Sequence, residues 1–205
     1  MHSLKAENLA KQFGSRKVFS GLSFELGVGQ SLAITGRNGT GKSTLLMLLL
    51  GLYHPTRGEV SYIQDGSIMD DRAIRARTSL VSPYLNLYDQ LTGEENLVFL
   101  ATLSGVNLTG KQIDSLLARV GLEGRGVDLV STYSSGMKQR LKYAAALLKD
   151  PMYLFLDEPG SNLDADGKQV VRDIVLERRA KSIVVVATNE EEEYSLADGI
   201  IRLGQ

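Results

Sequence analysis

The sequence predicts an α/β protein in which a parallel sheet carries helices on its faces. An apolar run at residues 32–34 precedes a glycine-rich loop, and a longer apolar run at residues 45–50 follows it, which is the pattern of a strand, a loop and a helix. Strand-like runs at residues 152–156 and 182–187 flank a helical stretch at residues 166–179. Such alternation indicates a parallel sheet, because parallel strands need a crossover connection.

Length and composition indicate one soluble domain. The chain has 205 residues, of which 43% are hydrophobic and 23% charged, a balance typical of a globular protein with a sizeable core. The formal net charge of −1 favours neither nucleic acid nor an anionic membrane as a partner, and the lack of cysteine fits a reducing compartment. The longest apolar run is far short of the roughly 20 residues that a membrane-spanning helix needs, and the N-terminus lacks a signal-peptide core. We therefore expect a cytoplasmic protein.

The N-terminal part is predicted to be mostly β-structure. Residues 4–13 and 18–26 carry alternating apolar side chains on either side of a short turn, which is the pattern of an antiparallel hairpin or meander. Residues 59–63 alternate again, and residues 73–81 indicate a short helix that runs into a strand.

Residues 84–148 change character and are predicted to form a helical insertion. Thr92 and Thr109 each begin a capping box, in which a threonine is followed three residues later by a glutamate or glutamine at the start of a helix. A third helical stretch covers residues 134–148 and ends before a proline.

Four consecutive acids occupy residues 190–193. We interpret them as the first turn of a helix at residues 194–197, because the positive end of a helix stabilises negative charge. A cation site is the less favoured alternative. A last short strand is expected at residues 199–203.

The glycine-rich loop has the pattern G-x-x-x-x-G-K-[ST] of a phosphate-binding loop. Its glycines let backbone N–H groups wrap a phosphate, and the following helix adds unpaired N–H groups and partial positive charge. Lys42 is expected to reach the β- and γ-phosphates, and the Ser43 hydroxyl to bind Mg²⁺. The residues expected to bind the nucleotide are Gly36, Arg37, Asn38, Gly39, Thr40, Gly41, Lys42, Ser43 and Thr44.

Two carboxylates follow the apolar strand at residues 152–156. Asp157, at the carboxyl end of that strand, can hold Mg²⁺ directly or through water. Glu158 points elsewhere and can act as the general base toward an attacking water. A buried strand followed by an acidic helix cap is the structural alternative, and the upstream phosphate-binding loop makes the functional reading the stronger one.

A second helix start with the character of an anion site begins at Ser134. A serine and a glycine open this helix, and its free N–H groups could bind a phosphate. An ordinary N-cap is the alternative, since serine caps helices well. One nucleotide does not need two such helix ends, so the second is expected to serve a nucleotide held by another subunit.

Together these motifs resemble the nucleotide-binding domain of ABC transporters, and the resemblance covers essentially the whole chain. Phe13 matches the aromatic residue that stacks on adenine in that family, and residues 87–97 match the segment that leads into its helical subdomain, where membrane partners dock. The resemblance assigns Ser134, Ser135, Gly136 and Met137 to the signature motif that faces a nucleotide held by the partner, and Asp164 to the D-loop.

The resemblance implies a P-loop NTPase fold with a RecA-like core sheet, an N-terminal antiparallel β subdomain and an inserted helical subdomain. It implies one ATPase domain over residues 1–205, with a nucleotide-binding core at residues 1–83 and 149–205 and a helical subdomain with the signature motif at residues 84–148. It also implies ATP and Mg²⁺ as cofactors, and a homodimer or heterodimer of ATPase subunits formed on ATP binding. Integral membrane subunits would hold the chain at the cytoplasmic side of the inner or cell membrane, and no nucleic acid is expected as a partner.

Within the family, two groups of exporters are similar to this chain. Residues 18–24 and the short length, with nothing after the last strand, resemble the haem-exporter ATPase of cytochrome c maturation. Residues 136–140 resemble the ATPases of ABC-2 type exporters. Both remain open at this point, and the transported substrate would be chosen by the membrane subunits.

The sequence also departs from the family pattern. Pro83 stands where a glutamine contacts Mg²⁺ or its water, and Asn189 stands where the family has its switch histidine. Ser135 replaces a glycine and Met137 a glutamine of the signature motif. The candidate catalytic residues are therefore Lys42, Glu158 and Asn189.

Three functions remain open. The leading one is an ATPase that powers a membrane exporter, for haem or for another substrate. The second is a regulatory module that binds ATP and dimerises but turns over slowly. The third is a soluble ATPase acting on DNA or ribosomes, which is disfavoured because such relatives usually carry tandem domains or a long coiled-coil insertion.

Overall fold

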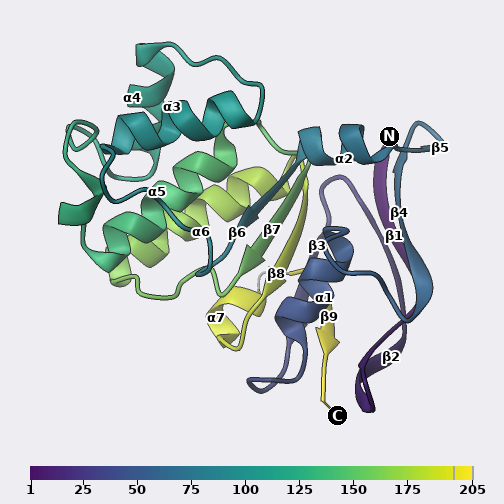
Figure 1. The fold of residues 1–205 in the computed structure, drawn as a ribbon. Coiled ribbons are helices and arrows are strands. Elements are labelled where there is room, and N and C mark those ends of the chain that lie inside the picture. Colours follow the sequence, from purple (N-terminus) through teal and green to yellow (C-terminus); the bar gives the residue numbers. More distant parts are fainter. Residues whose placement is uncertain (196, 205) are drawn as a thin grey trace.

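The computed structural model describes residues 1–195 and 197–204, which form two sheets with helices between and around them (Figure 1). Within this part of the chain, five strands make a parallel sheet in the order β6-β7-β8-β3-β9. The strands of β3, β7 and β8 are buried at every position, which suits their continuous apolar runs. The strand bounds are β3 (Ser31–Thr35), β6 (Thr78–Val81), β7 (Tyr153–Asp157), β8 (Ile183–Ala187) and β9 (Gly199–Arg202).

The predicted N-terminal β-structure is an antiparallel sheet with the order β2-β1-β4-β5. Its first two strands form the predicted hairpin, and the predicted third strand pairs with the first rather than extending the hairpin. The bounds are β1 (His2–Phe13), β2 (Arg16–Gly27), β4 (Arg57–Gln64) and β5 (Ser67–Ile68).

Helix α1 (Lys42–Leu49) lies between the two sheets, while α5 and α6 cover the other face of the parallel sheet (Figure 1). The predicted helix that runs into a strand is α2 (Asp71–Arg77), which leads into β6. The predicted insertion contains α3 (Gly93–Leu103), α4 (Gly110–Arg119), a single 3₁₀ turn (Val130–Thr132) and α5 (Ser135–Leu147), and α6 (Ala165–Arg179) follows β7. The division of the chain into residues 1–83, 84–148 and 149–205 stays a prediction.

The capping signals lie where the sequence places them. At the start of α3, the Glu95 N–H donates to Thr92 Oγ1 at 3.2 Å and the Thr92 N–H donates to the Glu95 carboxylate at 2.8 Å. At the start of α4, the Thr109 N–H donates to the Gln112 side-chain oxygen at 2.8 Å. These bonds satisfy N–H groups that a helix start leaves without partners.

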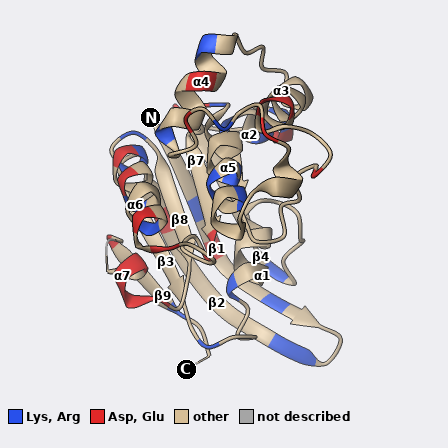
Figure 2. Cartoon of the chain, turned by 90° about the vertical axis from the view of Figure 1, so that its left-hand side faces the viewer, with Lys and Arg blue, Asp and Glu red and all other residues tan. Residues whose placement is uncertain are grey.

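The acids lie in the first turn of a helix, as predicted, but that helix begins earlier than expected. Helix α7 spans Glu191–Tyr194, so three of the acids lie inside the helix and Glu190 is its N-cap. The helix predicted at residues 194–197 therefore begins earlier, and residue 196 of that range lies outside the described residues. Figure 2 shows these acidic residues together on α7.

The core consists of two apolar clusters on opposite faces of the parallel sheet. Side chains alternate along β7, so that Tyr153 and Phe155 join the cluster with α1, whereas Leu154 and Leu156 join the cluster with α3–α6. No helix within residues 1–195 and 197–204 combines the length and apolar character that crossing a membrane requires.

Candidate functional site

The glycine-rich loop connects the end of β3 to the start of α1, as predicted. Gly36, Gly39 and Gly41 adopt φ angles of 145°, 81° and 107°, which side chains with a Cβ rarely tolerate. A Cβ on Gly41 would also lie 2.3 Å from Val18 Cγ1. Both backbone conformation and space therefore require glycine at this position.

Lys42 begins α1, and its side chain is only 5% exposed. Its ammonium donates a hydrogen bond to the carbonyl of Gly36 at 2.9 Å. The cation is thus held back over its own loop, where it lies beside the free N–H groups of the helix start. This concentration of donors and positive charge is suited to a phosphate.

A cavity of about 570 Å³ opens over the loop. It brings together parts of the chain that are far apart in sequence, and its lining residues are Phe13, Arg16, Val18, Asn38, Gly39, Gly41, Lys42, Ser43, Thr44, Tyr84 and Glu158. The structure therefore joins most of the predicted nucleotide-binding residues with the predicted base in one site. Gly36 and Arg37 line a neighbouring cavity with Asn38 and Asn189.

Phe13 lies at the mouth of this cavity with a half-exposed ring. Tyr53 packs edge-on against it at a centroid distance of 6.0 Å, and Lys11 Nζ lies 4.7 Å from the Phe13 centroid. An exposed ring held by these neighbours presents a flat apolar face of the kind on which a nucleotide base can stack.

Arg16 and Tyr84 line the same cavity, although the sequence does not mark them as site residues. The Arg16 guanidinium donates to the carbonyl of Gly39 at 3.1 Å, which fixes one side of the loop. Arg16 lies next to the hairpin turn in the sequence, and that position does not indicate a contact with the glycine-rich loop. Tyr84 could have been predicted, because it follows Pro83, which stands where the family has its Mg²⁺-contacting glutamine.

Ser43 and Asp157 form a pair beneath the loop. The Ser43 hydroxyl donates to Asp157 Oδ1 at 3.1 Å, and Asp157 is only 1% exposed. Burial raises the pKa of the Asp157 carboxyl, although the Ser43 hydrogen bond and the Lys42 charge act in the opposite direction.

These two side chains fit Mg²⁺. Asp157 Oδ2 is buried without a hydrogen-bond partner, and a buried carboxylate oxygen in that state is costly unless a donor or cation reaches it. Within the described residues, no group of three or more His, Cys, Asp or Glu side chains could hold a metal. Mg²⁺ does not need such a cage, since it commonly keeps several waters and binds substrate phosphates together with one or two protein oxygens.

Glu158 diverges from Asp157 because the backbone turns at this residue. Its φ angle is +49°, which is uncommon for a residue with a side chain, and its N–H donates to the Ala187 carbonyl at 2.8 Å. Glu158 lines the cavity over the loop and also a smaller cavity of about 200 Å³. Such backbone outliers concentrate at functional sites.

Asn189 follows β8 and reaches the glycine-rich loop. Its amide Nδ2 donates to Asn38 Oδ1 at 2.7 Å. Strand β8 lies next to β7, so Asn189 and Glu158 end neighbouring strands and line the same smaller cavity. The carboxyl ends of adjacent parallel strands are where ligands bind in such sheets.

Pro83 does not line the cavity over the loop, and its backbone carbonyl contacts α5 instead. Lys142 Nζ donates to that carbonyl at 2.9 Å and to the Ser82 carbonyl at 3.3 Å. The segment that carries Tyr84 is therefore tied to α5, a contact that the sequence did not predict.

The predicted signature residues lie apart from the cavity over the loop, since residues 134–137 do not line it. Ser134 caps α5 by accepting a hydrogen bond from the Met137 N–H at 3.2 Å, and Asp164 caps α6 by accepting one from the Gly167 N–H at 2.8 Å. A Cβ on Gly136 would lie 3.3 Å from the Asn162 carbonyl oxygen, so the two caps are neighbours. The helix start at Ser134 is thus not used by the chain's own loop.

A protein-family profile described as "ABC transporter" matches residues 19–161, which is more than half of the chain. The chain belongs to the ABC transporter family. Linearmycin resistance ATP-binding protein LnrL of Bacillus subtilis is 32% identical over 210 residues, which cover 98% of this chain and 67% of that protein. Nod factor export ATP-binding protein I of Burkholderia orbicola is 34% identical over 195 residues, which cover 93% of this chain and 64% of that protein.

A solved structure described as the ATP binding subunit of an ABC transporter superposes with a TM-score of 0.82 at 27% identity, covering 98% of this chain and 85% of that one. The P-loop NTPase fold predicted from the sequence is therefore confirmed, and the chain is an ABC-type ATPase domain that binds ATP. The chain spans about two thirds of the length of the two curated relatives.

Proposed function

We propose that this ABC ATPase domain drives export through separate integral membrane subunits. The observation that carries the proposal is the cavity in which Lys42, Ser43 and Glu158 meet over the glycine-rich loop. Two relatives are named for resistance to linearmycin and for Nod factor export, which supports an exporter. These names favour the ABC-2 type alternative over haem export.

Each side chain has a proposed role in hydrolysis. Lys42 and the loop N–H groups bind the β- and γ-phosphates, and Phe13 stacks on the base. Ser43 and Asp157 hold Mg²⁺, which would neutralise phosphate charge when bound. Glu158 accepts the proton of the attacking water.

The nucleotide is proposed to be shared between two copies of the ATPase domain, or between this chain and a related subunit. Ser134 and Gly136 of one copy would complete the phosphate site of the other, because the start of α5 does not line the chain's own cavity and its free N–H groups would suit a phosphate. The neighbouring Asp164 segment would lie at the same contact.

The experiment is nucleotide-dependent dimerisation. We expect wild-type protein to be monomeric without nucleotide, and Glu158→Gln protein to dimerise with ATP and Mg²⁺, because the amide keeps the shape of the site but cannot accept the proton. Adding Ser134→Arg should abolish the dimer, since its bulk and charge occupy the second phosphate site. Light scattering measures the mass of each.

Ser115→Arg in the same Glu158→Gln background is the matched control, because Ser115 is an exposed serine on α4. It should leave the dimer intact. A monomer under every condition would contradict the shared site, and a stable dimer without nucleotide would require a different interface.

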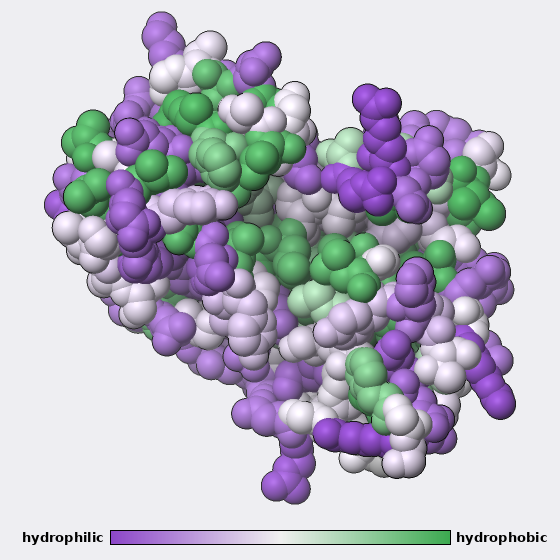
Figure 3. Space-filling view, viewed as in Figure 1, coloured by the Kyte–Doolittle hydropathy of each residue, from purple (hydrophilic) through white to green (hydrophobic). Residues whose placement is uncertain are grey.

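Membrane subunits are proposed to dock on the helical part of the chain. Figure 3 shows apolar side chains gathered over the lobe that contains α3 and α4. Tyr88 and Phe99 pack edge-on there at 4.9 Å, and Leu103 is 70% exposed. Exposed apolar patches of this kind mark interaction sites. The chain would then lie at the cytoplasmic face of the inner or cell membrane.

The low-turnover regulatory module is the second candidate, and Asn189 is the observation that favours it. Losing one well-placed transition-state donor typically costs about 10²–10³ in rate, of which the asparagine amide can recover a part. We expect Asn189→His to raise turnover at saturating ATP and to change ATP affinity little, because the imidazole reaches further toward the γ-phosphate. Steady-state hydrolysis and nucleotide titration measure the two quantities.

Two results would contradict this account of Asn189. If Asn189→Ala hydrolyses ATP at the wild-type rate, Asn189 only caps the end of β8 and has no role in hydrolysis. A fast wild type that Asn189→His slows would mean that the site is built around the amide, and the regulatory alternative would fall with it.

A further inference from the structure

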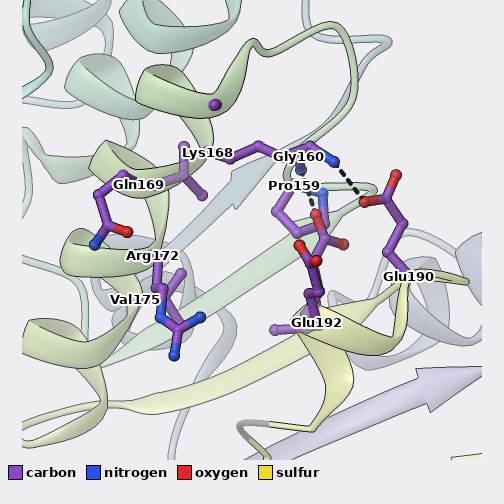
Figure 4. A pocket seen from close by; sticks show the side chains of 12 residues that line it. Pro159, Gly160, Lys168, Gln169, Arg172, Val175, Glu190 and Glu192 are labelled. Carbon is purple, nitrogen blue, oxygen red and sulfur yellow. Dashed lines mark hydrogen bonds and ion pairs between the residues drawn. The ribbon is translucent and has the colours of Figure 1, made fainter.

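The start of helix α7 is tied to its surroundings by two contacts, one to the segment after β7 and one to α6, which Figure 4 draws beside a cavity of about 250 Å³. The Gly160 N–H donates to Glu193 Oε1 at 2.8 Å, and Lys168 of α6 pairs with Glu190 at 2.7 Å. The Lys168–Glu190 pair is partly exposed, so it contributes little stability. The Glu193 contact lies deeper.

Glu193 also lies beside the segment that precedes α7. Thr188, which is 1% exposed, lines the same small cavity as Glu193. Burial raises the pKa of the Glu193 carboxyl, and the Thr188 hydroxyl acts in the opposite direction. The same hydroxyl accepts a bond from the Glu190 N–H at 3.0 Å. The Glu193 carboxylate therefore accepts a hydrogen bond from Gly160, two positions after Glu158, and lies beside Thr188, the residue immediately before Asn189.

The lack of a side chain at Gly160 leaves the space that the Glu193 carboxylate occupies. A Cβ on Gly160 would lie 2.3 Å from Glu193 Oε1. Gly160 is not among the glycines with a positive φ angle, so its backbone does not require glycine. The lack of a side chain there is explained by the close approach of Glu193.

Glu193 lies at the candidate catalytic centre without entering the nucleotide cavity. The smaller cavity of about 200 Å³ is lined by Glu158, Asn189 and Glu193. Glu193 does not line the cavity over the glycine-rich loop. A change at Glu193 should therefore affect the placement of Glu158 and Asn189 more than the binding of ATP.

We infer that Glu193 is a positioning residue for ATP hydrolysis, which fixes the segment after Glu158 against the segment that carries Asn189. The inference rests on the catalytic roles proposed above for these two residues. The alternative is that Glu193 only stabilises α7, as an acid in the first turn of a helix.

The test is steady-state hydrolysis by Glu193→Ala, Gly160→Ala and the double variant. Loss of one hydrogen bond of ordinary strength in the reacting state corresponds to a decrease in kcat of about tenfold, and KM for ATP should stay within about twofold. In Gly160→Ala, the added methyl group displaces the carboxylate and should lower kcat similarly. The double variant should be no slower than the slower single variant, because both remove the same contact.

Glu193→Gln is the conservative variant, since its Oε1 can still accept the Gly160 N–H, and we expect it to restore most of kcat. Glu192→Ala is the matched control, because Glu192 lies on the same helix and lines the cavity of Figure 4, but its carboxylate makes no hydrogen bond among the described residues. Only its backbone carbonyl accepts one, from the Ser195 hydroxyl, and the substitution leaves that carbonyl in place. Glu192→Ala should keep wild-type kcat and KM.

An unchanged kcat in Glu193→Ala would overturn the inference while leaving the ATPase role intact. Equal losses in Glu192→Ala and Glu193→Ala, or additive losses in the double variant, would also overturn it. A wild-type protein without ATP hydrolysis would instead overturn the proposed function first.

Discussion

Lys42→Ala is expected to abolish most of the affinity for ATP. The Lys42 ammonium is almost fully buried and is held over the loop by the Gly36 carbonyl, so its position is set before the nucleotide arrives. Charge-assisted contacts of this type are worth about 1.5–3 kcal/mol each. Each lost contact should therefore raise Kd by about tenfold or more, as calorimetric titration with ATP would measure.

Lys111→Ala is the control for the Lys42 experiment, because Lys111 is an exposed lysine on α4. Its affinity for ATP should equal that of the wild type. If folded Lys42→Ala protein binds ATP as tightly as wild type, the glycine-rich loop does not bind the phosphates and the proposed site is wrong.

Glu158→Gln is expected to stop hydrolysis while ATP binding is retained. General base catalysis typically contributes about 10²–10⁴ in rate, and the amide removes the proton acceptor without changing the shape of the side chain. Single-turnover hydrolysis measures the loss, and a fluorescent nucleotide measures the affinity.

Glu191→Gln serves as the comparison for Glu158→Gln, since it removes an exposed acid of α7 that lines none of the cavities described above. It should hydrolyse ATP at the wild-type rate. If Glu158→Gln still hydrolyses ATP at the wild-type rate, a group other than Glu158 is the general base.

The sequence predicts those features that depend on neighbours along the chain. The glycine-rich loop, the capping boxes at Thr92 and Thr109 and the apolar runs of β3, β7 and β8 are local patterns, because helices and strands repeat over a few residues. Asp157 and Ser43 could be paired as well, since the loop and the acidic strand end are two halves of one known site. The roles of the site residues stay predictions.

Contacts between distant side chains were beyond the reach of the sequence. Lys142 and Pro83 are 59 residues apart, and Asn189 and Asn38 are 151 apart. No period or cap marks such pairs, because they depend on how whole elements pack. The contact between Glu193 and Gly160 could not be predicted for a further reason. A run of acids at the start of a helix is expected to be exposed to solvent, and the sequence does not show which of them packs against the protein.

The alternation of side chains along β7 determines which carboxylate lies beneath the loop. Tyr153, Phe155 and Asp157 share one face of the strand, which is the face of α1 and therefore of Ser43. Deleting a single residue from β7 would rotate Asp157 to the opposite face, among the helices of the insertion. Every recognisable motif would still be present in such a protein, but Asp157 would lie on the wrong face of the sheet. An intact set of motifs therefore does not guarantee a working site.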